Sequence, residues 1–195
     1  MKKLQYNSPV ILSFFIVSLF SLILGHITNG VSTKLFFSVY HSSLADPLTY
    51  IRFIGHALGH ADINHFMSNM LLILVIGPTL EEKYGSIDLI VGIASTALIS
   101  GILQYIFFPN TALLGASGIV FMLIMLSSLS GMKEGKIPLT LILVAILYLG
   151  QELYSILFIT DNVANLMHIV GGICGTGFGL IIAKYHKPRR SYSQF

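Results

Sequence analysis

Apolar residues fall into six long runs along the chain, and short stretches between them carry most of the charged and turn-forming residues. A membrane-spanning helix needs about 20 consecutive, mostly apolar residues. The pattern therefore predicts an all-α fold, a single membrane domain over residues 1–195 with six transmembrane helices. Their approximate ranges are 9–27, 63–80, 87–107, 115–130, 137–158 and 163–183.

Composition agrees with this pattern. The chain has 195 residues, of which 54% are hydrophobic and 10% charged, and its mean hydropathy is +0.82. Soluble domains carry about 25% charged residues, so this chain has too little charge to cover a water-facing surface. We therefore expect the lipid bilayer to be its solvent. The formal charge of +3 does not suggest nucleic-acid binding, and the single Cys174 excludes an internal disulfide framework.

The basic residues predict the orientation. If the N-terminus is cytoplasmic, nine of the eleven Lys and Arg residues lie on the cytoplasmic side, and only Lys34 and Arg52 lie outside. This distribution is what the positive-inside rule expects. We therefore expect a multi-pass protein of the cell membrane with both termini in the cytoplasm. Residues 28–62 then form a long outer loop, whose aromatic residues suit a segment that lies partly in the membrane interface.

Polar residues inside apolar spans are costly, which makes them candidate functional residues. Ser117 stands among small residues in Gly115-Ala116-Ser117-Gly118 at the start of the fourth span. One interpretation is close helix packing, which small residues allow. The other is a nucleophile whose hydroxyl the flanking glycines expose, and such a serine needs a base within hydrogen-bond reach.

His168 in the sixth span is the candidate base. It precedes Gly171 by three residues, and Gly171 and Gly175 share one helix face, where another helix can approach closely. The small residues around Ser117 suit that approach, so the two side chains can meet. Taken alone, His168 could equally be a structural histidine bonded to a backbone carbonyl.

His65 and Asn69 form the third element. They are four residues apart and therefore lie on one face of the second span. Both can donate hydrogen bonds, which acyl transfer to a serine requires for the developing oxyanion. Either residue singly could instead join two helices by a polar contact.

Together these residues resemble the rhomboid family of intramembrane serine proteases, in its minimal six-span bacterial form. The resemblance extends from about Tyr50 to the end of the sixth span. The matching residues are Arg52, His56 and His60 in the string His56-Ala57-Leu58-Gly59-His60, His65 and Asn69, Glu81 and Gly85, Gly115-Ala116-Ser117-Gly118, and His168 with Gly171 and Gly175.

The resemblance implies an enzyme that cleaves transmembrane segments of membrane proteins near their outer end, with a Ser-His dyad and no cofactor or metal. Ser117 would be the nucleophile and His168 the general base, while His65, Asn69 and the Gly115 segment would support the oxyanion. His56 and His60 would support the first loop and the cavity. Arg52 and Glu81 would be polar anchors.

The chain departs from the family pattern at several positions. Ile51 replaces a frequent tryptophan, and Phe121 replaces a tyrosine that often stacks on the catalytic histidine. Leu166 and Met167 replace small residues, and they are large enough to widen the gap between the fourth and sixth spans. Their effect on activity is open, as is the role of Glu152 in the fifth span, where snorkelling to the interface is the simpler reading.

Three alternatives follow from the same residues. A catalytically weak or inactive rhomboid-like protein would bind membrane clients with this fold. A metal enzyme or metal transporter would use His56, His60 and His65, although no carboxylate or thiol completes a site. A secondary transporter would show repeated halves, which the chain lacks. The sequence indicates neither the physiological substrate nor the oligomeric state.

Overall fold

A computed structural model of the protein describes residues 6–130, 139–140, 142–143, 146–147 and 162–185. The regular structure in these residues is helical, with one isolated β-bridge between Val39 and Leu113. The fold is all-α, as predicted. The helices are α1 (Pro9–Ile27), α2 (Val31–Phe36), α3 (Pro47–Gly55), the 3-10 helix η1 (His56–Leu58), α4 (Ile63–Tyr84), α5 (Ser86–Phe107), α6 (Ser117–Leu129) and α8 (Asn162–Tyr185).

The long helices occur in the apolar runs. Within the described part of the chain, α1, α4 and α5 are long and apolar enough to cross a bilayer, while α6 and the apolar part of α8 are shorter. The predicted span at residues 137–158, which includes Glu152, lies outside the described residues except for three pairs of positions.

Two helix boundaries differ from the predicted ones. Helix α4 continues beyond Leu80 to Tyr84, so Glu81 lies in its last turn rather than after it. Gly85, with a φ of 91°, ends the helix. Helix α6 begins at Ser117 because Gly115 has a φ of 125°, which a right-handed helix does not allow.

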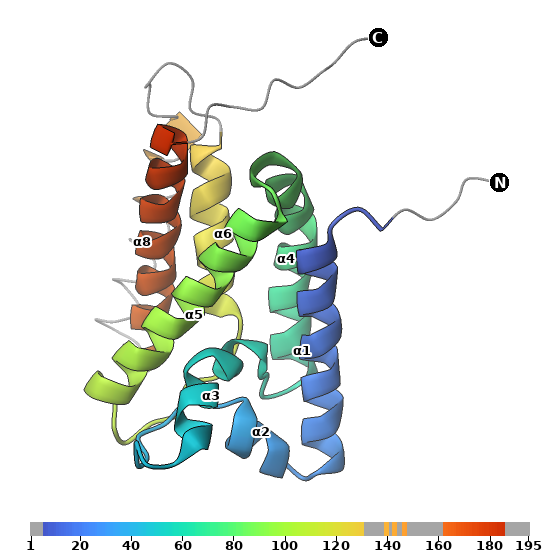
Figure 1. Ribbon diagram of the computed structural model, residues 1–195, viewed down its shortest axis with the longest axis vertical. Helices are drawn as coiled ribbons and strands as arrows, with labels where there is room; N and C mark the ends of the chain where they lie inside the picture. The colour runs from blue at the N-terminus through green and yellow to red at the C-terminus, as the bar shows by residue number, and fades with distance from the viewer. Residues whose placement is uncertain (1–5, 131–138, 141, 144–145, 148–161, 186–195) are drawn as a thin grey trace, which may run out of the picture.

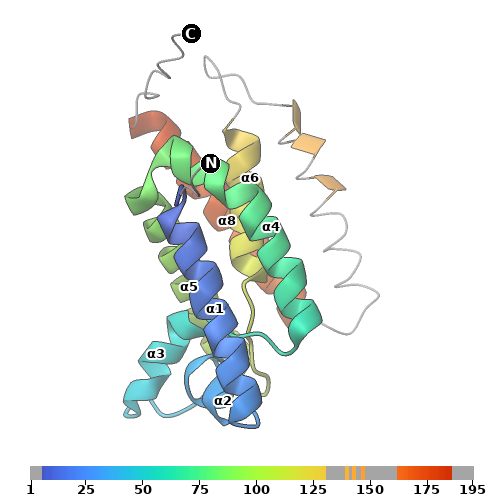
Figure 2. The same cartoon turned by 90° about the vertical axis from the view of Figure 1, so that its right-hand side faces the viewer.

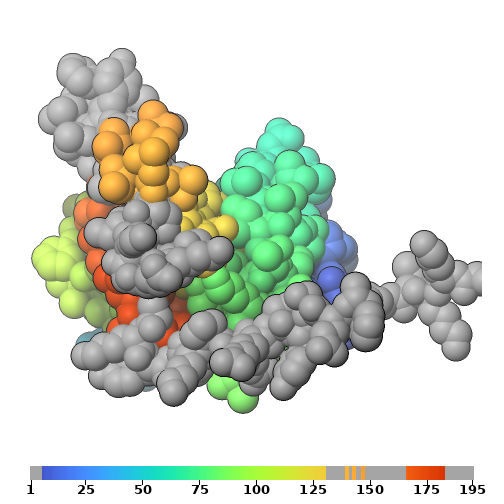
Figure 3. Space-filling model, turned by 90° about the horizontal axis from the view of Figure 1, so that it is seen from above, coloured from blue at the N-terminus to red at the C-terminus, as the bar shows by residue number. Residues whose placement is uncertain are grey.

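Helices α1, α4, α5, α6 and α8 run along the molecule, and α2 and α3 lie across one end (Figure 1). Helix α1 begins and α8 ends at the opposite end, which Figure 2 also shows. Seen from that opposite end, α6 lies between α4 and α8 (Figure 3). Its side chains Met122, Leu123 and Leu126 are fully buried and form the centre of the apolar core.

Among the described helices, α6 and α8 make the most extensive contact. A side chain at Gly171 would overlap the backbone carbonyl of Gly118, and one at Gly175 would overlap the carbonyl of Met122. Glycine at these two positions lets the backbones of the helices touch. In a bilayer such close packing is a main source of attraction between helices.

The large residues before His168 do not hold these helices apart. Met167 is buried and packs with Val39 and Leu113 in a second apolar cluster, against which Leu166 also packs. A Cβ on Gly118 would lie 3.4 Å from the carbonyl oxygen of Met167, so the two backbones are close at this level as well. The widened gap that the residue sizes suggested is not present.

A buried carboxylate joins α1 to α4. Glu81 is 4% exposed, and its two oxygens accept the backbone N–H groups of Val10 at 3.0 Å and Ile11 at 3.1 Å. The hydroxyl of Ser86 donates to the same carboxylate at 2.7 Å. The first N–H groups of a helix have no acceptor inside it, so Glu81 completes the start of α1.

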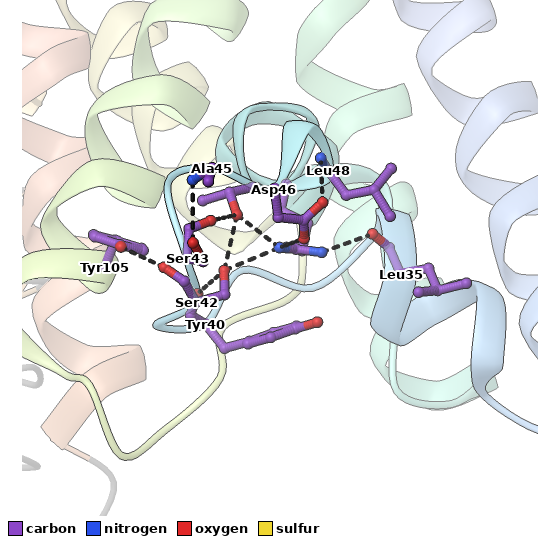
Figure 4. Close-up of polar contacts among 10 residues, drawn as sticks. Leu35, Tyr40, Ser42, Ser43, Ala45, Asp46, Leu48 and Tyr105 are labelled. Carbon is purple, nitrogen blue, oxygen red and sulfur yellow. Dashed lines mark hydrogen bonds and ion pairs between the residues drawn. The ribbon is translucent and has the colours of Figure 1, made fainter.

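Arg52, which is 1% exposed, is the centre of the polar contacts in the loop between α1 and α4. Figure 4 shows its partners Leu35, Ser42 and Asp46. Its guanidinium donates to the carboxylate of Asp46 at 2.9 Å, and this bond holds the pKa of Asp46 below its usual value. Asp46 also caps α3. The remaining oxygens near the guanidinium belong to Ser42 and Thr49, each at 2.9 Å, and to the Leu35 carbonyl at 3.4 Å.

We expect Gly171→Ala to destabilise the fold, because its methyl group must push α8 away from the Gly118 carbonyl. Overpacking of this kind costs about 1–3 kcal/mol. Thermal or denaturant unfolding in detergent measures the change. Gly177→Ala on the same helix is the matched control, since a Cβ there meets no atom within 4 Å. Equal stability of the two variants would contradict the close contact.

Glu81→Gln should also destabilise the protein, because the amide keeps one accepting oxygen and its nitrogen cannot accept, so either the Val10 or the Ile11 N–H loses its acceptor. Leaving a buried donor without an acceptor costs about 1–3 kcal/mol. Glu82→Gln, at the exposed neighbouring position, should leave the unfolding midpoint nearly unchanged. Equal unfolding midpoints of the Glu81→Gln and Glu82→Gln variants would show that the Glu81 carboxylate does not stabilise the start of α1.

Candidate functional site

Ser117 is the first residue of α6, and the turn before it depends on glycine. Gly115 has a φ of 125°, which favours glycine, and its N–H donates to the His56 carbonyl at 2.9 Å. Two residues earlier, the N–H groups of Leu113 and Val39 each donate to the other's carbonyl at 2.9 Å. The loop between α1 and α4 therefore holds the segment that leads into Ser117.

His168 lies on α8 beside the same turn. Its ring makes a tilted contact with the ring of Phe121 on α6, with the centroids 4.6 Å apart and the planes 43° apart. Its neighbour Met167 contacts Gly118, the neighbour of Ser117. Both Ser117 and His168 are half-buried. The two residues thus lie on two helices that touch at this level, and Phe121 makes an aromatic contact with His168, although the rings are tilted rather than stacked.

His65 lies on the other side of the turn. A Cβ on Gly115 would stand 2.7 Å from Cε1 and Nε2 of the His65 ring, so only glycine leaves room for the imidazole. The His65 ring is also close enough to His168 for charges on the two rings to repel. Asn69 is buried one turn further along α4, and its Nδ2 donates to the His65 carbonyl at 3.1 Å.

His56 and His60 are buried supports in this arrangement. Nε2 of His56 donates to the Ala97 carbonyl of α5 at 3.0 Å. The His60 ring packs edge-on against His65 and Phe66, with centroid distances of 5.1 and 5.4 Å. Burial lowers the pKa of His56 and of His60 to about 4, so both are neutral at pH 7.

A small cavity of about 10 Å³ adjoins the nucleophile candidate. Ser117, His56 and the backbone of Gly115 line it on one side, and Thr96 and Ser100 of α5 on the other. The Thr96 and Ser100 hydroxyls are buried and have no hydrogen-bond partner among the described residues. A space of this size, lined by several polar groups, suits one water molecule.

A family model for the Rhomboid domain matches residues 47–185, more than two thirds of the chain. The protein belongs to the rhomboid family. It is 29% identical to Rhomboid-related protein 2 of Mus musculus over 160 residues, which are 71% of this chain and 53% of the relative. It is 31% identical to Rhomboid-related protein 1 of Caenorhabditis elegans over 67% of this chain and 39% of the relative.

A bacterial relative covers more of the chain. Rhomboid protease GlpG of Pectobacterium atrosepticum is 29% identical over 177 residues, which are 88% of this chain and 62% of the relative. The chain spans about half the length of the mouse relative and less of the worm relative. Family membership and the apolar helices make this rhomboid a multi-pass membrane protein.

Sequence reasoning missed the contribution of α5 to the rhomboid site. Thr96 and Ser100 are buried polar residues four apart on one helix face, and both line the small cavity. Gln104, one turn further, does not line it and donates to Thr111 instead. The spacing of Thr96 and Ser100 within an apolar run was the available signal. Among the described residues, no group of three or more His, Cys, Asp or Glu side chains is placed to hold a metal ion.

Acid should destabilise the rhomboid fold through His56 and His60. The unfolded chain binds protons at these rings near pH 6.5, whereas the folded chain resists protonation down to about pH 4. The free energy of unfolding is therefore not reduced by these two rings above pH 6.5. The free energy of unfolding falls as the pH drops from 6.5 toward 4, by roughly 1 kcal/mol per pH unit for each ring.

Unfolding midpoints in detergent between about pH 7.5 and pH 4.5 measure this slope. His60→Phe keeps a flat ring without a titrating group and should make the slope shallower. His41→Gln alters an exposed ring and should leave it unchanged. A His60→Phe slope equal to that of the wild type would show that His60 protonates equally well in both states.

Proposed function

We propose that this rhomboid is an intramembrane serine endopeptidase in which Ser117 is the nucleophile and His168 the general base and acid. The contact between Gly118 and the Met167–Gly171 segment of α8 carries the proposal. Gly118 follows Ser117, and Met167 precedes His168, so this contact supports a close approach of the two side chains. The tilted ring contact between His168 and Phe121 supports this position of the imidazole.

In the first step the Ser117 hydroxyl attacks the carbonyl carbon of the scissile peptide bond, and His168 accepts its proton. The imidazolium then donates this proton to the leaving amine as the C–N bond breaks. The product is an acyl-enzyme on Ser117. No carboxylate is assigned as a third member, and the tilted contact with Phe121 supports the ring orientation instead.

The oxyanion of the tetrahedral intermediate needs donors close to Ser117. The N–H of Ser117 is in the first turn of α6, where no acceptor inside the helix is available to it. The His65 ring lies against Gly115 and offers a side-chain N–H on the same side. Asn69 donates one side-chain N–H to the His65 carbonyl. Its second side-chain N–H is then available to the oxyanion.

Hydrolysis of the acyl-enzyme requires water within a membrane protein. The small cavity lined by Ser117, Thr96, Ser100 and His56 has one-water size and supports a supply of water next to the nucleophile. His168 does not line this cavity, so the water would have to reach the His168 side of Ser117 before it attacks. His168, neutral again after the first step, takes a proton from the attacking water. Ser117 leaves with that proton as the acyl bond breaks.

The substrates would be transmembrane proteins. A transmembrane helix hides its carbonyl groups in its own hydrogen bonds, so the cleaved segment must open before Ser117 can attack it. We therefore expect cleavage near the outer end of spans that Gly, Pro or polar residues weaken. We place the enzyme in the cell membrane of a bacterium with both termini cytoplasmic, as the basic residues indicate.

Ser117→Ala and His168→Ala should each lower cleavage of a transmembrane substrate in reconstituted vesicles by about three orders of magnitude or more. Each variant removes one side of the proton transfer. Ser128→Ala, further along α6, replaces a hydroxyl that donates to the Ile124 carbonyl and should leave the rate within about twofold. Wild-type rates in either dyad variant would refute the assignment.

Labelling with a fluorophosphonate separates the enzyme from a catalytically inactive relative that only binds membrane clients. An active enzyme loses the label in Ser117→Ala and keeps it in Ser128→Ala. A folded wild-type protein that neither labels nor cleaves any transmembrane substrate would favour the client-binding alternative.

A further inference from the structure

A second and larger cavity, of about 510 Å³, opens at the α2–α3 end of the molecule. Its walls come from the end of α1, from α2, from the loop that follows and from the residues before α4. It shares no lining residue with the small cavity beside Ser117. The proposed proteolytic chemistry therefore gives it no role.

The lining of this cavity is basic and rich in hydrogen-bond donors. Lys34 and His26 are exposed at its rim, and Asn29, Thr33 and Tyr40 add neutral polar groups. No Asp or Glu is among its lining residues in the described chain. Asp62, which acts electrostatically on His60, does not line the cavity, and its carboxylate accepts the His65 N–H. The cavity thus favours an anion.

His60 gives an independent indication of a ligand. Its side chain lines the cavity and is 3% exposed, yet neither ring nitrogen has a hydrogen-bond partner among the described residues. The Leu58 backbone lies near the ring without reaching hydrogen-bond geometry. Buried polar groups are normally paired, and an acceptor in the cavity would satisfy the His60 N–H.

The position of the cavity along the membrane normal indicates the source of the anion. Phe20, Ile23 and Ile27 are exposed along α1 up to the level of the cavity, as expected for a surface in contact with acyl chains. Val31 and Leu35 are exposed apolar residues of α2, beside Lys34. The rim of the cavity therefore lies where the hydrocarbon ends and the phosphate groups of lipids begin.

We propose that this cavity binds the phosphate group of an anionic phospholipid, with Lys34 providing the charge and His60 and Asn29 providing hydrogen bonds. A volume of about 510 Å³ accommodates a glycerophosphate headgroup. The acyl chains would lie against α1 and α2. A free phosphate ion presents the same oxygens, and the experiment distinguishes the two sources.

The experiment measures phospholipid bound to the purified protein by native mass spectrometry, as phosphatidylglycerol or phosphatidylcholine is titrated into the detergent. We expect phosphatidylglycerol to bind more tightly and Lys34→Gln to weaken its binding by about fivefold. His60→Phe should weaken it too while it preserves the ring packing. Lys83→Gln makes the same charge change at the opposite end of α4 and should have no effect.

A parallel arm compares unfolding midpoints in inorganic phosphate and in chloride at equal ionic strength. Suppose that phosphate raises the unfolding midpoint of the wild type but not that of Lys34→Gln, and that phosphatidylglycerol is not preferred. This result would overturn the lipid source and assign the site to a free anion. Equal lipid binding by the wild type and the folded Lys34→Gln variant, with no phosphate effect, would overturn the proposal entirely.

Discussion

The close contact of α6 and α8 is the constraint on which the rest of the structure depends. Lipid gives two helices no hydrophobic reason to associate, so they adhere through packing of atoms at short range. Gly171 and Gly175 remove the side chains that would separate the backbones from Gly118 and Met122. Any chemistry between a residue of α6 and a residue of α8 requires this distance to be kept.

Two charged side chains hold the remaining elements around this pair, one at each end of the molecule. Glu81 accepts hydrogen bonds from the first N–H groups of α1, and Arg52 donates hydrogen bonds to oxygens of the loop between α1 and α4. Both are almost fully buried, and both have several partners, which is the condition under which a buried charge is tolerated.

Much of the fold was predictable because the bilayer restricts the choice of structure. Apolar runs can only be helices there, so the α1 limits at Pro9 and Ile27 follow from hydropathy and proline alone. Ser117 and His168 were identifiable because polar residues are rare in such runs. The contacts of their neighbours bring α6 and α8 together at this level, while the pairing of Ser117 with His168 and their catalytic roles stay a proposal.

Other features depend on contacts that hydropathy does not record. The positive φ of Gly115, which delays α6 by two residues, arises where the His65 ring fills the space of a side chain. The size of Met167 suggested a wedge, but the direction of its side chain depends on a pocket formed with Val39 and Leu113.

The bridge between Val39 and Leu113 joins the loop between α1 and α4 to the turn that precedes Ser117. Two backbone hydrogen bonds join them, and the His56 carbonyl adds a third at Gly115. A pull on the loop from the membrane surface would be transmitted through these bonds to the start of α6. The start of α6, where Ser117 lies, is therefore tied to a segment distant in the chain.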